Sequence, residues 1–155
     1  MIVGVGITNA GSDQGQMSPM LEQLRDRYGQ GPDEMLVDGG FAGLEEIERA
    51  RGAGCTVFAP PVRPRDPARD PYQPLPGDSP GVAEWRVRMG TAEAKEIYKE
   101  RAATAECVNA LSRNRGLWQF PVRGQLKARA VLLWYALAQN LRRAFALGAL
   151  ARAPA

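Results

Sequence analysis

The most informative stretch of the chain is YKERAATAECVNALSR, residues 98–113, with Val37-Asp38-Gly39-Gly40 some way upstream. Read as a helix with about 100° between successive residues, this stretch places five polar side chains on one face. They are Tyr98, Arg101, Glu106, Asn109 and Arg113. A carboxylate between two guanidiniums, beside a phenol and an amide, differs from a merely solvated face, where Glu and Lys usually alternate. The pattern predicts a face that holds a metal ion together with a phosphate group.

Plainer interpretations of the same residues exist. Glu106 could form a surface ion pair with Arg101 or Arg113, which would contribute little to stability. Its spacings of five and seven residues from them are not those that make pairs effective within a helix. Both arginines could instead be solvated, and Tyr98 could belong to the core or to the wall of the site. Asp38, followed by two glycines, could be a turn residue, although α/β sheets also place their sites at strand ends.

The pattern around these residues predicts alternating strands and helices. Apolar runs rich in β-branched residues predict strands, and apolar periodicity flanked by Ser-Pro or Gly predicts helices. The predicted strands are 2–8, 35–37 and 56–59, and the predicted helices are 18–28, 41–53, 82–113 (with a possible break at Gly90) and 125–147. This order predicts an α/β fold, and the length of 155 residues suits a single domain over 1–155.

Residues 62–80 interrupt this alternation with a segment crowded with Pro, Arg and Asp. Such a composition disfavours regular structure, so a loop within the domain is predicted. We favour a simple flexible insertion over a loop that touches DNA through Arg63, Arg65 and Arg69.

The composition excludes several kinds of site. The chain contains no histidine, which removes His-based triads and the usual zinc sites. Cys55 and Cys107 form neither a CxxC pair nor a disulfide framework, so a reducing cytoplasm is expected. The remaining carboxylates, amines, guanidiniums and hydroxyls suit hard cations with oxygen ligands.

The net charge of +3 hides an asymmetry along the chain. Residues 1–97 carry ten Lys/Arg and fifteen Asp/Glu, whereas residues 98–155 carry ten and two. A basic C-terminal third is what binding to a phosphate backbone requires, although it could simply balance an acidic front. The start of the chain lacks a signal-peptide pattern, and the uncharged stretch 130–141 is too short to span a bilayer. We therefore expect no membrane association, a core helix over that stretch, and a cytoplasmic location.

Taken together, these motifs resemble the DDE transposases of bacterial insertion sequences, the group with a Tyr-Arg-Glu-Lys signature. Tyr98, Arg101 and Glu106 match the first three signature residues, and Arg113 stands where the family usually has Lys. Asp38 matches the second catalytic Asp. The segments 8–17, 114–117 and 133–140 also resemble this family, so that the resemblance covers nearly the whole chain.

The resemblance implies the later strands and helices of an RNase H-like core, with the Pro/Arg-rich insertion and a helical C-terminal part. It implies Asp38 and Glu106 as catalytic residues and ligands of Mg²⁺, in a site where two metal ions promote phosphoryl transfer. It also implies that Tyr98, Arg101, Asn109 and Arg113 contact DNA. The implied partner is double-stranded DNA at the ends of an insertion sequence.

The family's first catalytic Asp lies on a strand upstream of the one that residues 2–8 resemble. Asp13 follows that strand in a loop, which is the wrong place for a substitute. We therefore interpret the chain as a truncated, C-terminal part of a transposase that lacks the first Asp and is inactive as an isolated fragment. The alternative is a non-catalytic remnant that binds DNA, associates with itself or pairs with a full-length transposase.

Overall fold

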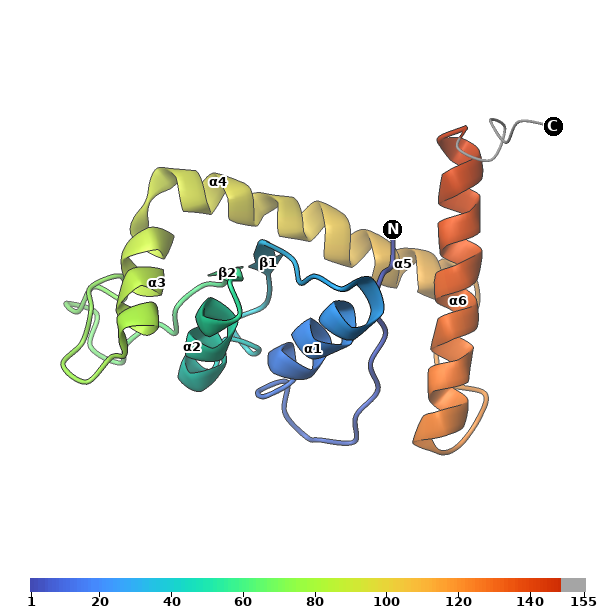
Figure 1. Ribbon diagram of the computed structural model, residues 1–155, viewed down its shortest axis with the longest axis horizontal. Helices are drawn as coiled ribbons and strands as arrows, with labels where there is room; N and C mark the ends of the chain where they lie inside the picture. The colour runs from blue at the N-terminus through green and yellow to red at the C-terminus, as the bar shows by residue number, and fades with distance from the viewer. Residues whose placement is uncertain (149–155) are drawn as a thin grey trace. The chain divides into compact units, whose positions relative to one another are not determined.

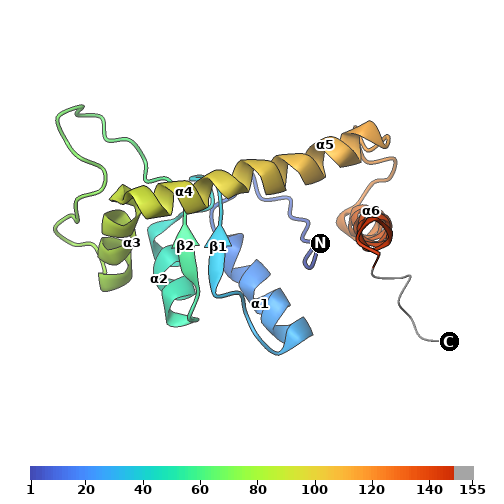
Figure 2. The same cartoon turned by 90° about the horizontal axis from the view of Figure 1, so that it is seen from above.

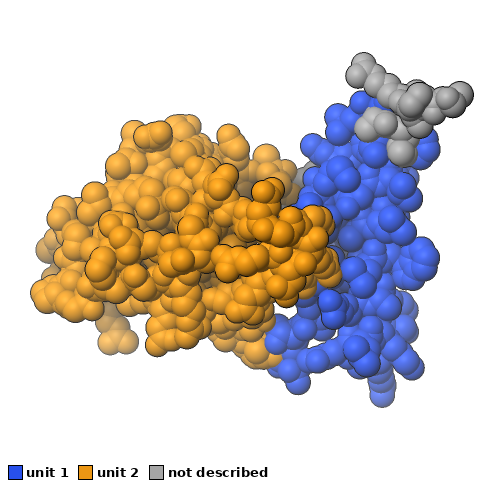
Figure 3. All heavy atoms as spheres, in the orientation of Figure 1, with its two compact units in different colours: residues 1–9, 110–155 blue, residues 10–109 orange. Residues whose placement is uncertain are grey.

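The computed structural model of the chain describes residues 1–148, apart from the side chains of residues 105–109. The chain divides into two compact units, which Figure 3 colours separately. Unit 2 comprises residues 10–109, and unit 1 comprises residues 1–9 together with residues 110–155. The prediction of a single domain over 1–155 stays a prediction.

Unit 2 is built on two short parallel strands, β1 (Glu34–Leu36) and β2 (Thr56–Phe58), with Met35 opposite Val57. Helix α2 (Leu44–Gly52) connects them, as a crossover between parallel strands requires. Helix α1 (Met17–Tyr28) precedes β1, and it ends at Gly29 with φ of 73°, a left-handed conformation that glycine adopts at no steric cost. The predicted α/β alternation is confirmed for this part of the chain; an RNase H-like core is consistent with it.

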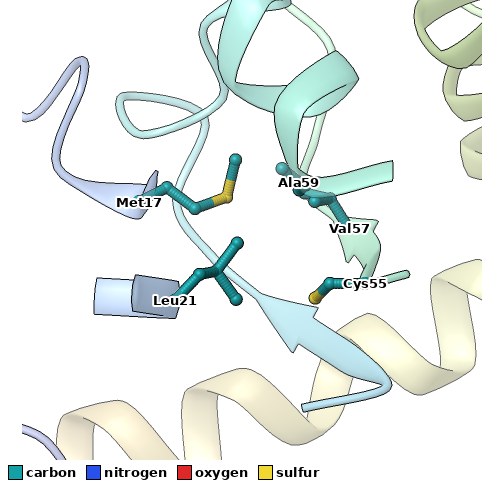
Figure 4. Packing of buried hydrophobic residues seen from close by; sticks show 6 residues of the cluster. Met17, Leu21, Cys55, Val57 and Ala59 are labelled. Atoms are coloured by element: carbon teal, nitrogen blue, oxygen red, sulfur yellow. The ribbon is translucent and has the colours of Figure 1, made fainter. Parts of the chain in front are cut away.

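Successive side chains of a strand point to opposite sides of the sheet, and both sides of this sheet carry core residues. On one face Val57 and Ala59 pack against Met17 and Leu21 of α1 and against Cys55 (Figure 4). On the other face, the core consists of Ile47, Phe58, Val82, Trp85, Met89 and Ala94. Apolar residues at consecutive strand positions are typical of a buried parallel sheet.

Helix α3 (Pro80–Gly90) and helix α4 (Ala92–Arg101) follow the Pro-rich loop. The break predicted at Gly90 is confirmed. Thr91 has an extended backbone, and its hydroxyl accepts a hydrogen bond from the Ala94 N–H, so it caps α4. A Cβ on Gly90 would lie 3.0 Å from the Cβ of Tyr72, so this close approach favours glycine.

The Pro-rich loop is tied down at its end rather than being simply flexible. Asp78 forms an ion pair with Arg86 of α3 at 2.8 Å, and both side chains are nearly buried. Arg86 also donates a hydrogen bond to the Pro71 carbonyl at 3.2 Å. The expected free insertion is therefore wrong for residues 71–78, which these contacts hold against α3.

Unit 1 contains helix α6 (Gln125–Ala146) and the end of helix α5 (Cys107–Asn114). The predicted strand at residues 2–8 is wrong, since no strand is assigned there. The Asn140 side chain instead pairs with the backbone of Ile2, accepting from its N–H and donating to its carbonyl, both at 2.7 Å. An alternating apolar pattern predicts a strand only where a second strand supplies these bonds.

The apolar stretch of α6 forms only a partial core. Ala128 and Ala136 are buried, whereas Leu137 and Leu141 remain 47% and 46% exposed. Within the described part of the chain, no helix is both long and apolar enough to cross a membrane.

Candidate functional site

The candidate site lies where β1 ends and α4 passes the carboxyl ends of both strands (Figures 1 and 2). The Val37 N–H donates to the Phe58 carbonyl at 3.0 Å, which continues the pairing one residue beyond β1. Asp38 is the next residue, and its side chain is 55% exposed. The carboxylate therefore stands at the strand end, where a crossover α/β unit places its functional groups.

Two side chains of α4 reach this strand end. The Arg101 guanidinium forms an ion pair and hydrogen bond with the Asp38 carboxylate. The Tyr98 hydroxyl donates a hydrogen bond to the Val37 carbonyl at 3.2 Å. Residues three apart share a helix face, so Tyr98 and Arg101 both contact the end of β1.

The electrostatics of this contact keep the phenol protonated. Burial raises the pKa of Tyr98 above its ordinary value, and the Asp38 carboxylate raises it further, whereas Arg101 opposes both. A protonated hydroxyl is the donor that the Val37 carbonyl needs. Arg101, only 23% exposed at its side chain, in turn supplies the positive charge beside Asp38.

The turn after Asp38 is crowded at Gly39 but not at Gly40. A Cβ on Gly39 would lie 3.3 Å from the Pro60 carbonyl oxygen, tighter than most real contacts. A Cβ on Gly40 would lie 3.7 Å from a carboxylate oxygen of Asp13. The loop that carries Asp13 is therefore near the Asp38 turn, a proximity that no spacing in the sequence signals.

Glu106 and Asn109 belong to the predicted site, but their side chains lie outside the described residues. The backbone around them departs from the prediction of one regular α-helix. Residues 102–106 form a π-helix, η1 (Ala102–Glu106), between α4 and α5. Because a π-helix bonds residues five apart rather than four, the face calculated at a uniform 100° per residue is wrong beyond Arg101. Single π-turns occur frequently at functional sites.

The remaining predicted residue, Arg113, is exposed and belongs to unit 1. Unit 1 also exposes both of its tryptophans. Trp118 is 75% exposed and Trp134 is 71% exposed. The Tyr135 hydroxyl donates to the Arg115 carbonyl at 3.0 Å, so this ring is anchored to the loop after α5.

The described donors fit a divalent cation only in part. Asp38 offers a hard oxygen ligand that is half exposed, although Arg101 engages it. Among the described residues, no group of three or more His, Cys, Asp or Glu side chains could hold a metal ion. These residues alone therefore do not make a two-metal site.

Comparison with known proteins finds one similarity, in the second half of the chain. No match was found among curated proteins or among solved structures. Residues 80–145, under half of the chain, match a family model described as a transposase DDE domain. The matched segment runs from α3 into α6 and contains Tyr98 and Arg101. This match supports a DDE transposase, with DNA as its substrate and transposition and DNA recombination as its function; such enzymes typically use divalent metal ions.

Proposed function

We propose that this chain is a C-terminal part of the catalytic domain of a bacterial insertion-sequence transposase, from the Tyr-Arg-Glu-Lys signature group. The carrying observation is that α4, inside the segment that matches the transposase domain, holds Asp38 through Arg101 and the adjoining carbonyl through Tyr98. The first two signature residues therefore contact the end of the strand that carries Asp38, and this contact supports the proposal. Arg113 in place of Lys keeps the charge but changes the donor geometry.

In this proposal Asp38 and Glu106 are the two carboxylates that the chain contributes to a Mg²⁺ site. When bound, the ions of such a site supply activation of the attacking oxygen and stabilisation of the leaving oxygen. Arg101 holds Asp38 in place, and it becomes a phosphate contact when DNA arrives, since guanidinium binds carboxylate and phosphate alike. Tyr98, Asn109 and Arg113 are the proposed further DNA contacts.

The first prediction concerns cleavage. The chain alone should not cut DNA in Mg²⁺ above background, because two-metal catalysis needs both ions about 3.5–4 Å apart and the ligand set is incomplete. Fusing the opening strands of a DDE transposase core, with their Asp, should restore cutting. The measurement is a cleavage assay on element-end DNA, with Glu106→Gln in the fusion as control. Cutting by the chain alone would show that the proposed site is misplaced.

A non-catalytic DNA-binding remnant is the second candidate, and the charge distribution favours it. Residues 1–9 and 110–155 contain eight Lys/Arg and no Asp/Glu, whereas residues 10–109 contain twelve and seventeen. Unit 1 therefore carries a net charge of +8 and unit 2 a net charge of −5.

The second prediction tests this candidate. The chain should bind duplex DNA weakly, with little sequence preference, and its affinity should fall steeply with salt because phosphate contacts release counterions. Fluorescence anisotropy across a salt series measures the slope. Arg113→Gln should lower the slope by about 1. Binding that ignores salt would contradict the proposal.

A further inference from the structure

The loop between α5 and α6 exposes two aromatic rings. Trp118 is 75% exposed and Phe120 is 43% exposed, although burial of such rings contributes strongly to stability. The loop is short and ends at Gly124, which has φ of 90° and begins α6. Rings presented in this way, outside a core, are available to a ligand.

Phe120 lines an open hollow of about 550 Å³ within unit 1. The other walls come from residues 6–8 of the N-terminal segment, from Val122 and Gly124 of the loop, and from Gln125, Ala128 and Leu132 of α6. The lining is mainly apolar, and Thr8 and Gln125 contribute polar groups. An open, mainly apolar surface with an aromatic wall and a few polar groups suits the face of a planar heterocycle.

Three exposed cations are sequence neighbours of residues that line this hollow. Arg123 lies between two lining residues, and Lys127 and Arg129 flank the lining residue Ala128; all three cations are exposed. The whole of unit 1 contains no Asp or Glu to neutralise them. A ligand with planar rings and repeated negative charges matches both properties.

We propose that the Trp118–Phe120 loop and the hollow beside it bind single-stranded DNA. One base stacks on Trp118, a neighbouring base enters the hollow against Phe120, and the phosphates meet Arg123 and Lys127. Base stacking on aromatic rings beside a basic surface is a general mode of single-strand recognition. A paired duplex hides its base faces and cannot use these rings. The inference rests on the proposed function, since strand cutting at element ends produces unpaired nucleotides.

The test compares a fluorescein-labelled 20-nucleotide single strand with a hairpin duplex of the same composition, by anisotropy on the full chain. Trp118→Ala should weaken single-strand binding about tenfold or more. It should leave the duplex affinity within about twofold and the salt slope unchanged, because no phosphate contact is lost. Trp118→Phe, which keeps an aromatic face, should retain most of the affinity. Arg123→Gln should lower the salt slope by about 1.

The matched control is Trp134→Ala, because Trp134 is 71% exposed, nearly as much as Trp118, but lies on α6 rather than in the loop that carries Phe120. It should leave single-strand binding unchanged. Equal losses in both tryptophan variants would overturn the inference. Duplex binding without any single-strand binding would overturn it and leave the proposed function standing. Loss of self-association in Trp118→Ala, with single-strand binding intact, would assign the loop to a protein contact instead.

Discussion

At the scale of single residues, side-chain exposure distinguishes a structural ion pair from the pair at the candidate site. Asp78 and Arg86 are nearly buried, with side chains 5% and 11% exposed, whereas the Asp38 carboxylate is half exposed. A buried pair fixes the fold, because either partner alone would be an uncompensated charge. A half-exposed carboxylate held by a single arginine can exchange that partner for another ligand.

Asp78 therefore carries a prediction about stability and pH. Burial alone would raise its pKa, but hydrogen bonds from the Leu75 N–H and Arg86 outweigh it and hold the pKa below the ordinary 3.8. A lowered pKa in the folded state adds stability above the unfolded pKa and loses it as pH falls through the folded value. Asp78→Asn should cost about 3–5 kcal/mol near neutral pH and should flatten this dependence below about pH 4.

Urea unfolding between pH 2.5 and 7 measures both effects. Glu84→Gln is the matched control, since its partner Arg51 is 2.9 Å away but both side chains are about half exposed. That variant should cost no more than about 1 kcal/mol. Equal costs for the two variants would show that burial does not distinguish these pairs.

At the scale of elements, the π-helix between α4 and α5 is the unexpected feature. It lies directly after Arg101, so the signature is divided between a described α-helical half and a second half with shifted register. The sequence has the pattern of an ordinary amphipathic helix, so it did not predict this π-helix.

Deleting Ala103 should convert η1 into regular α-helix. We expect circular dichroism at 222 nm to show undiminished helix, and thermal unfolding to show an unchanged or higher midpoint. The transposase-core fusion should keep its cleavage, because a π-turn holds one residue more than an α-turn, so removing one residue leaves Glu106 and the residues after it in about the same direction relative to Tyr98 and Arg101. Ala103→Ser keeps the length and should also retain activity. Loss of cleavage in the deletion variant alone would show that the π-turn itself has a role in the site.

Local backbone preferences explain which helix and loop boundaries the sequence could predict. Gly29, Gly90 and the Pro-rich loop predicted element boundaries through backbone preferences that act within a few residues. The strand predicted at residues 2–8 is wrong because a strand depends on a distant partner strand, and at Ile2 the Asn140 side chain bonds to the backbone instead. At the site, the sequence pointed to Asp38 and the first turn of the signature, but the approach of Asp13 depends on a loop path that no pattern encodes.

At the scale of the whole molecule, the two units differ in sign of charge. Unit 1 has no acidic residue, and unit 2 contains all seventeen. Opposite charges on different copies attract at low ionic strength and are screened when the Debye length falls. Leu133 and Leu137 are exposed on the apolar side of α6. Association through this side would instead be strengthened by kosmotropic salts such as sulfate.

The last prediction uses that difference. Sedimentation velocity at rising NaCl concentration should show association at low salt that dissociates by about 0.3 M, where screening is strong. Leu137→Gln should leave the low-salt association unchanged. Association that strengthens in sulfate and disappears in Leu137→Gln would instead assign self-pairing to the apolar side of α6.

The buried Cys55 makes the rate of local opening in unit 2 measurable. Its side chain lies in the cluster beneath α1, 4% exposed, and burial together with Asp33 and Glu34 raises its pKa. Alkylation requires both access and a thiolate, so the reagent reacts only after α1 separates from β2. At high reagent concentration the labelling rate at Cys55, followed by peptide mass, becomes the rate of that separation. The native thiol thus reports how often α1 separates from the sheet, without an introduced cysteine.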